Sequence, residues 1–219
     1  MGEVTLGLVN GVVIRNAVAL IKEKFNWFAW EWYDGVATDP HAIEPVDFSI
    51  TIAMNSRATA GRMKAFMERR RQLEERLARV PEDVRLAKDT PASVLQAAAD
   101  LFDEACQAVG TKLALASKVL HRKRPLLIPM LDKVVVNGHY WLVLDGPTPP
   151  RWFDTTWLKN GAWSNPTMYM RVMAEELDGN RDSLQELRRR LPPEAPTSVS
   201  DVRLLEATLH AHLQRRSAG

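Results

Sequence analysis

Apolar side chains recur at steps of three and four residues along most of this 219-residue chain. That spacing places them on one face of an α-helix, so it favours helices packed around a common core. Residues 61–80 show it most clearly, with arginines and glutamates between the apolar positions and Pro81 to stop the helix. Further helices are predicted over residues 91–105, 111–122, 168–177 and 198–213, with one more beginning near Pro129.

Strand signals are few. Residues 4–14 and 141–144 are rich in β-branched or aromatic side chains, yet neither segment has an evident partner, so we expect helix or extended chain there. Three loops are predicted, all too short to link domains, over residues 34–45, 145–151 and 192–197. We therefore predict an all-α fold, a multi-helix single domain over residues 1–219 that forms one body or two helical lobes.

Composition excludes several classes of protein. The single cysteine, Cys106, cannot form an intramolecular disulfide, and no apolar run reaches the roughly 18–20 residues that span a bilayer. We therefore expect a cytoplasmic protein without a membrane partner. The net charge is only +2, but residues 109–133 hold six basic side chains against the single acid Asp132. Such a focused segment indicates either an anionic partner or a solvated helix face.

The basic segment begins with a glycine at the corner between two predicted helices, in the sequence QAVGTK over residues 107–112. An aspartate, Asp132, follows Lys112 by twenty residues, near the start of the next predicted helix. This arrangement resembles the helix-hairpin-helix element of DNA glycosylases, in which the glycine lets the backbone approach a phosphate. Ala108 stands where those enzymes usually have a first glycine.

The resemblance implies a helix-hairpin-helix-like element near residues 95–124, inside a core over about residues 91–144. It also implies that the backbone of Val109, Gly110 and Thr111 binds a DNA phosphate at the N-terminus of the following helix.

The same resemblance implies catalytic roles for Lys112 and Asp132. In bifunctional glycosylases a lysine two residues after the hairpin glycine attacks the sugar, and an aspartate about twenty residues later supports the reaction. Cleavage of an N-glycosidic bond develops positive charge on the sugar, which a carboxylate stabilises, and a lysine amine of lowered pKa can form a Schiff base. The simpler alternatives are that Asp132 caps a helix and that Lys112 is solvated or contacts a phosphate.

Four further cations in the segment are candidates for contact with DNA or another anion: Lys118, Arg122, Lys123 and Arg124. They belong to a run, SKVLHRKRPLLIPMLD over residues 117–132, that is similar to an uncharacterised bacterial family of unknown function. That family has the pattern SK-LL-x-RKRP-x-LIP-x-x-D, and its flanking segments resemble Tyr33-Asp34 and the helix over residues 198–205. This similarity implies no activity and does not include Lys112.

Seven tryptophans are many for this length. Most of their area serves a core, but some aromatic side chains can line a pocket and stack on a flat ligand. The candidates are Trp27, Trp30, Tyr33 and Trp141. No metal and no cofactor are expected, because His210 and His212 point to different sides of their helix and the glycine-rich phosphate-binding motifs are absent from the sequence.

Three functions remain open from the sequence. The leading hypothesis is a DNA-interacting protein resembling a helix-hairpin-helix glycosylase, which cleaves an N-glycosidic bond and has double-stranded DNA as its partner. A rival is an enzyme that takes a flat small molecule, a metabolite or natural product, into an aromatic pocket on the same scaffold. A third is a non-catalytic binding module.

Overall fold

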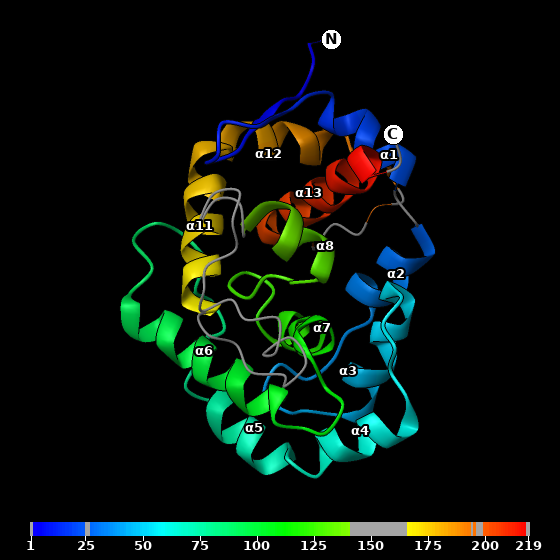
Figure 1. Ribbon diagram of the computed structural model, residues 1–219, viewed down its shortest axis with the longest axis vertical. Helices are drawn as coiled ribbons and strands as arrows, with labels where there is room; N and C mark the ends of the chain where they lie inside the picture. Colours follow the sequence, from blue (N-terminus) through cyan, green and yellow to red (C-terminus); the bar gives the residue numbers. More distant parts are fainter. Residues whose placement is uncertain (1, 25–26, 141–165, 194, 196–198, 218–219) are drawn as a thin grey trace.

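The computed structural model describes residues 2–24, 27–140, 166–193, 195 and 199–217, and these form an all-α protein with one small hairpin (Figure 1). The predicted all-α class is therefore confirmed. The segment 141–144 and the loop 145–151 lie outside the described residues. Within the described part of the chain, no helix combines the length and the apolar character needed to cross a membrane.

The elements that position the site follow in chain order. Strands β1 (Leu6–Gly7) and β2 (Val13–Ile14) precede the helices α1 (Ala17–Lys24), α2 (Trp27–Gly35), α3 (Pro45–Ser49), η1 (Ile50–Met54, a 3-10 helix), α4 (Ala60–Met67), α5 (Arg70–Leu77), α6 (Ala92–Cys106), α7 (Leu113–Lys123), α8 (Lys133–Val135), η2 (Val136–Tyr140, a π-helical turn), α11 (Pro166–Gly179), α12 (Arg181–Arg189) and α13 (Asp201–Ser217).

The first residues form a hairpin rather than the helix or extended arm that we expected. β1 and β2 pair antiparallel, with Leu6 opposite Ile14, and both of these side chains are fully buried. Gly11 lies in the connecting turn with a φ of +78°, a conformation that favours glycine. Asn180 fixes the hairpin to the rest of the molecule, because its side chain accepts from the Gly7 amide at 2.8 Å and donates to the Gly7 carbonyl at 2.7 Å.

The single helix predicted over residues 61–80 is two helices, α4 and α5, and the break lies at Glu68 and Arg69. Arg69 leaves the helical conformation, with φ −98° and ψ 8°, and its side chain donates to Glu104 of α6 at 2.8 Å. The break allows Phe66 of α4 and Leu73 of α5 each to reach the core fully buried.

The two helices around the predicted glycine corner are present as α6 and α7, and they pack against each other. Gly110 adopts a φ of +77° in the turn between them. A Cβ at this position would also lie 3.1 Å from the Cγ and Nε of Arg62. The turn therefore requires glycine for its backbone conformation, whatever it binds.

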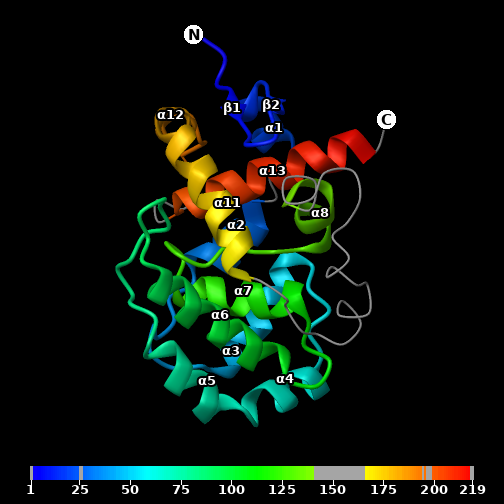
Figure 2. The ribbon, with the colours of Figure 1, turned by 60° about the vertical axis from the view of Figure 1, so that its left-hand side comes forward.

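Helix α13 is buried over most of its circumference, although the sequence predicted only one apolar stripe. It contacts α1, α8, α11 and α12, and its charged residues Arg203 and Glu206 are buried with its leucines. Figures 1 and 2 place α3 to α7 at one end of the molecule and the hairpin, α1, α12 and α13 at the other. One continuous apolar cluster, from Val4 to Ala211, joins the two ends into a single domain.

Candidate active site

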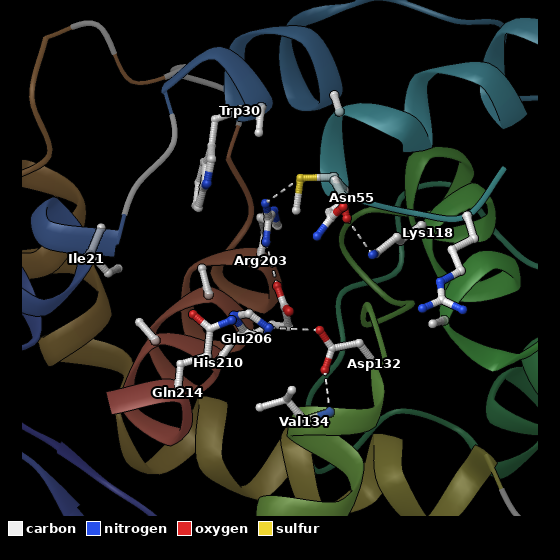
Figure 3. A pocket seen from close by; sticks show the side chains of 17 residues that line it. Ile21, Trp30, Asn55, Lys118, Asp132, Val134, Arg203, Glu206, His210 and Gln214 are labelled. Atoms are coloured by element: carbon white, nitrogen blue, oxygen red, sulfur yellow. Dashed lines mark hydrogen bonds and ion pairs between the residues drawn. The ribbon is translucent and has the colours of Figure 1, made fainter. Parts of the chain in front are cut away.

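A cavity of about 780 Å³ lies between α13 and the segments that face it, which belong to α1, α2, η1, α7 and α8 (Figure 3). Its volume falls within the range of about 300–1,000 Å³ that is typical of sites for small ligands. Apolar side chains from α1 and α2 line one part. The charged lining residues are Arg57, Lys118, Asp132, Arg203, Glu206 and His210.

Asp132 has both carboxylate oxygens engaged. Oδ1 accepts from the amides of Val134 at 2.8 Å and Val135 at 3.0 Å, so it caps the short helix α8. Oδ2 lies 3.0 Å from Nε2 of His210 on α13. The preceding residue is also held, because the Leu131 amide donates to the buried hydroxyl of Ser117 at 3.0 Å. Helix α8 therefore begins after Asp132. The sequence had predicted a start near Pro129.

The Asp132–His210 pair favours its charged form. Burial alone raises the pKa of the Asp132 carboxyl, but the hydrogen bond and charge of His210, the Val135 amide and the charge of Lys118 together lower it below its ordinary value. The hydrogen bond to Asp132 raises the pKa of His210 although burial opposes this. The wall of the cavity therefore holds a carboxylate that ionises more readily than usual beside an imidazole that binds its proton more tightly than usual.

Arg203 forms the second charged group of the wall. It lies 2.5 Å from Glu206 and 3.3 Å from Asp34, and its guanidinium stacks 4.2 Å from the ring centroid of Trp30. Burial raises the pKa of Glu206 despite the opposing charge of Arg203. Two carboxylates thus balance this arginine, and one face of Trp30 is already occupied by it.

Lys118 is buried, and its Nζ donates to the Met54 carbonyl at 2.8 Å. Within the described part of the chain no carboxylate lies within 4.0 Å of this Nζ. Burial lowers the pKa of Lys118, although Asp132 and Glu206 oppose the shift from a greater distance. The predicted candidates Lys118, Asp132 and Trp30 therefore meet in one cavity.

The other predicted pocket and turn residues lie elsewhere. Lys112 is exposed at the N-cap of α7 and does not line the cavity that holds Asp132. Val109 and Gly110 are exposed in the turn, and Thr111 is buried. Tyr33 is fully buried and does not line the cavity, and its hydroxyl donates to the Lys118 carbonyl. The side chain of Trp27 and all of Trp141 lie outside the described residues.

The predicted basic surface at the end of α7 is folded inward. Lys123 is fully buried and pairs with the equally buried Asp47 at 2.6 Å, and it also donates to the Asp39 carbonyl at 2.7 Å. Arg122 donates to the carbonyls of Tyr33 and Val36. The structure therefore contradicts the expected exposure of these two cations.

Arg124 is buried in the same way and bonds only to backbone. It donates to carbonyls of the loop before α3 and of the end of α5: Pro40 at 2.8 Å, Leu77 at 3.0 Å and Val80 at 2.6 Å. A buried guanidinium satisfies several carbonyls at once, because it carries five donors in a fixed plane. Arg122, Lys123 and Arg124 thus join segments of the fold and do not present a face to DNA.

Three site residues were missed from the sequence: Arg203, Glu206 and His210. From the sequence, His210 was considered only together with His212, as a pair of metal ligands. Their spacing of three and four residues places them on one face of α13, beside the predicted leucine stripe. Polar side chains at regular steps beside the apolar stripe of α13 were the available signal.

The chemistry of the site follows from its donors. In the described ranges no group of three or more His, Cys, Asp or Glu side chains is placed to hold a metal ion. The available chemistry is that of an oriented carboxylate and imidazole, which stabilise positive charge or transfer a proton. Fold and site together define an all-α protein with a cavity between its helices and a carboxylate–imidazole pair in the cavity wall.

Comparison with known proteins places the chain in a family. Residues 17–212 match DUF6308, a family of unknown function, and the chain belongs to that family. The predicted similarity to an uncharacterised family is therefore confirmed. No curated protein and no solved structure matches the chain. The likeness to glycosylases rests on its motif and remains a prediction.

Proposed function

We propose that the protein hydrolyses the N-glycosidic bond of a nucleoside unit, with double-stranded DNA as the source of that unit. The observation that carries the proposal is the ionised carboxylate of Asp132, held by two amides and His210 at the wall of a cavity of about 780 Å³. A fixed negative charge at a water-accessible site stabilises the positive sugar that forms when such a bond breaks.

In this reaction the bond between the sugar carbon and the base nitrogen breaks. Water supplies a hydroxyl group to the sugar carbon and a proton to the departing base. Asp132 stabilises the developing positive charge and orients the water. His210 positions the carboxylate and keeps it ionised, because its Nε2 proton is directed at Oδ2.

The turn at Gly110 supports DNA as the source. Val109, Gly110 and Lys112 are exposed, and Ala114, one residue into α7, lines the cavity. A phosphate bound at the N-terminus of α7 would bring the adjoining nucleotide to the cavity mouth. Enzymes that act on a base in a duplex take that base out of the stack into such a pocket.

A second candidate is hydrolysis of a free small molecule. The observation that favours it is the burial of Lys123 and Arg124, which withdraws charge from any DNA-facing surface. Non-specific affinity for DNA depends on the number of phosphates that cations neutralise.

Incubation with duplexes that carry modified bases, and separately with free nucleosides, tests both candidates. We expect release of a base from a duplex, and a loss of about 100-fold or more in rate for Asp132→Asn with DNA binding retained. Cleavage of nucleosides alone supports the second candidate. Binding that Asp132→Asn leaves unchanged, without cleavage of any substrate, indicates a binding module and overturns both.

A further inference from the structure

Lys118 is a buried ammonium group with unused hydrogen-bonding capacity. Its three donors have one acceptor in the described structure, the Met54 carbonyl at 2.8 Å. A charge removed from water is costly unless a partner of opposite charge compensates it. Because Lys118 lines the cavity, a bound ligand is able to supply that partner.

The acidic groups of the cavity are committed to other cations. Asp132 pairs with His210 and caps α8, and Glu206 pairs with Arg203. Lys118 therefore differs from Arg203, which has two carboxylates of its own.

The segment after η1 lines the same cavity as Lys118. Asn55 ends η1 with a φ of +55° and ψ of +33°, a left-handed conformation that asparagine adopts more readily than most residues and that commonly ends a helix. Asn55 and Arg57 line the cavity beside Lys118, and Figure 3 shows Asn55 and Lys118 on the same side of it, across Arg203 from Trp30.

We infer that Lys118, Asn55 and Arg57 form an anion subsite of the cavity that takes a phosphate group of the ligand. The inference rests on the proposed function, since a nucleoside unit in DNA carries a phosphate on either side of its sugar. The phosphate belongs either to the DNA backbone or to a free nucleotide, and both sources present the same chemistry to the ammonium group.

Titration calorimetry with thymidine 5′-monophosphate and thymidine tests the subsite. The wild type is expected to bind the monophosphate at least about tenfold tighter than the nucleoside, as one charge-assisted contact provides. Lys118→Met is expected to abolish this preference. Lys64→Met, which removes an exposed lysine outside the cavity and outside the Gly110 turn, is the matched control and keeps the preference.

A wild type without the preference, or a Lys118→Met variant that retains it, overturns the subsite. Arg57→Gln is a second test of the subsite. Arg57 is exposed, so its substitution does not disturb the core as the substitution of a buried residue can. This variant is expected to bind the monophosphate about threefold more weakly than the wild type and to bind thymidine with unchanged affinity. Equal affinity of Arg57→Gln and wild type for the monophosphate counts against the subsite.

The same titrations with a duplex that carries an abasic-site analogue identify the source. If Lys118→Met weakens the duplex as well as the monophosphate, the phosphate belongs to the DNA backbone, and if it weakens the monophosphate alone, the phosphate belongs to a free nucleotide. Asp132→Asn separates this inference from the proposed function, because it removes cleavage and keeps the phosphate preference. In the wild type, a phosphate preference without cleavage overturns only the proposed function. Cleavage without a phosphate preference overturns only the subsite.

Discussion

Lys123 and Asp47 form an ion pair 2.6 Å long in which neither side chain is exposed to solvent. Lys123→Met leaves the buried Asp47 with only the more distant Arg122, whose Nε lies 3.9 Å from its Oδ1, and we expect the free energy of unfolding to fall by about 3 kcal/mol. Urea denaturation measures the change. Lys64→Met is the control, because the pair of Lys64 with Glu68 is exposed and 3.9 Å long. It should change stability by less than about 0.5 kcal/mol. Equal effects of the two variants would contradict the structural role of Lys123.

The Asp132–His210 pair makes stability depend on pH. His210 has a raised pKa in the folded protein, so its contribution is complete below its ordinary pKa of 6.5 and disappears as pH rises through the raised value. Asp132 has a lowered pKa, so its contribution is complete above the ordinary 3.8 and disappears as pH falls through the lowered value.

We expect His210→Gln to destabilise the protein most between about pH 4 and 6.5, where both partners are charged. Urea denaturation of both proteins across this range and up to pH 9 gives the comparison. A difference that stays constant from pH 5 to pH 9 would show that the imidazolium charge does not contribute.

The sequence predicted part of the site at the residue scale. Asp132 and Lys118 were candidates because they lie in a basic segment with a recognisable spacing. His210 and Arg203 were not, because periodicity reveals the faces of α13 but not which face meets Asp132. The basic run at the end of α7 led to a wrong prediction of exposed cations for a related reason. Charge in a sequence does not reveal that loop carbonyls and Asp47 surround Arg124 and Lys123 in the fold.

At the scale of elements, the turn between α6 and α7 gives a paired test. Gly110→Ala forces an alanine to a φ of +77° and brings its Cβ to 3.1 Å from Arg62, so we expect a loss of about 1–2 kcal/mol. Gly61→Ala, inside α4 with open space around a Cβ, is expected to add up to about 1 kcal/mol. Thermal and urea denaturation compare the two. A neutral Gly110→Ala would show that the turn relaxes without glycine.

Most helices were predictable because their apolar positions repeat locally. The hairpin over residues 6–14 was not, since β1 and β2 are two residues each and depend on Asn180 from far along the chain. The break between α4 and α5 was hidden for the same reason, because Arg69 leaves the helix to reach Glu104. Local pattern predicts an element, and distant contacts decide where it ends.

For the whole molecule, the continuous core predicts cooperative unfolding. The apolar cluster from Val4 to Ala211 includes both groups of helices, and α13 packs against α1, α8, α11 and α12. We expect one transition in urea, with far-ultraviolet circular dichroism and tryptophan fluorescence coinciding. Two separated transitions would instead indicate two helical lobes that unfold independently.

The order of the chain gives the cavity a consequence for biosynthesis. Its wall draws on residues as early as Ile21 and as late as Gln214. A ribosome releases α1 to α8 before α13, and early segments begin to fold during synthesis. A nascent chain that stops before Asp201 has Asp132 without His210 and Asp34 without Arg203. Newly made protein therefore completes this cavity only when α13 has left the ribosome and docks against the helices made before it.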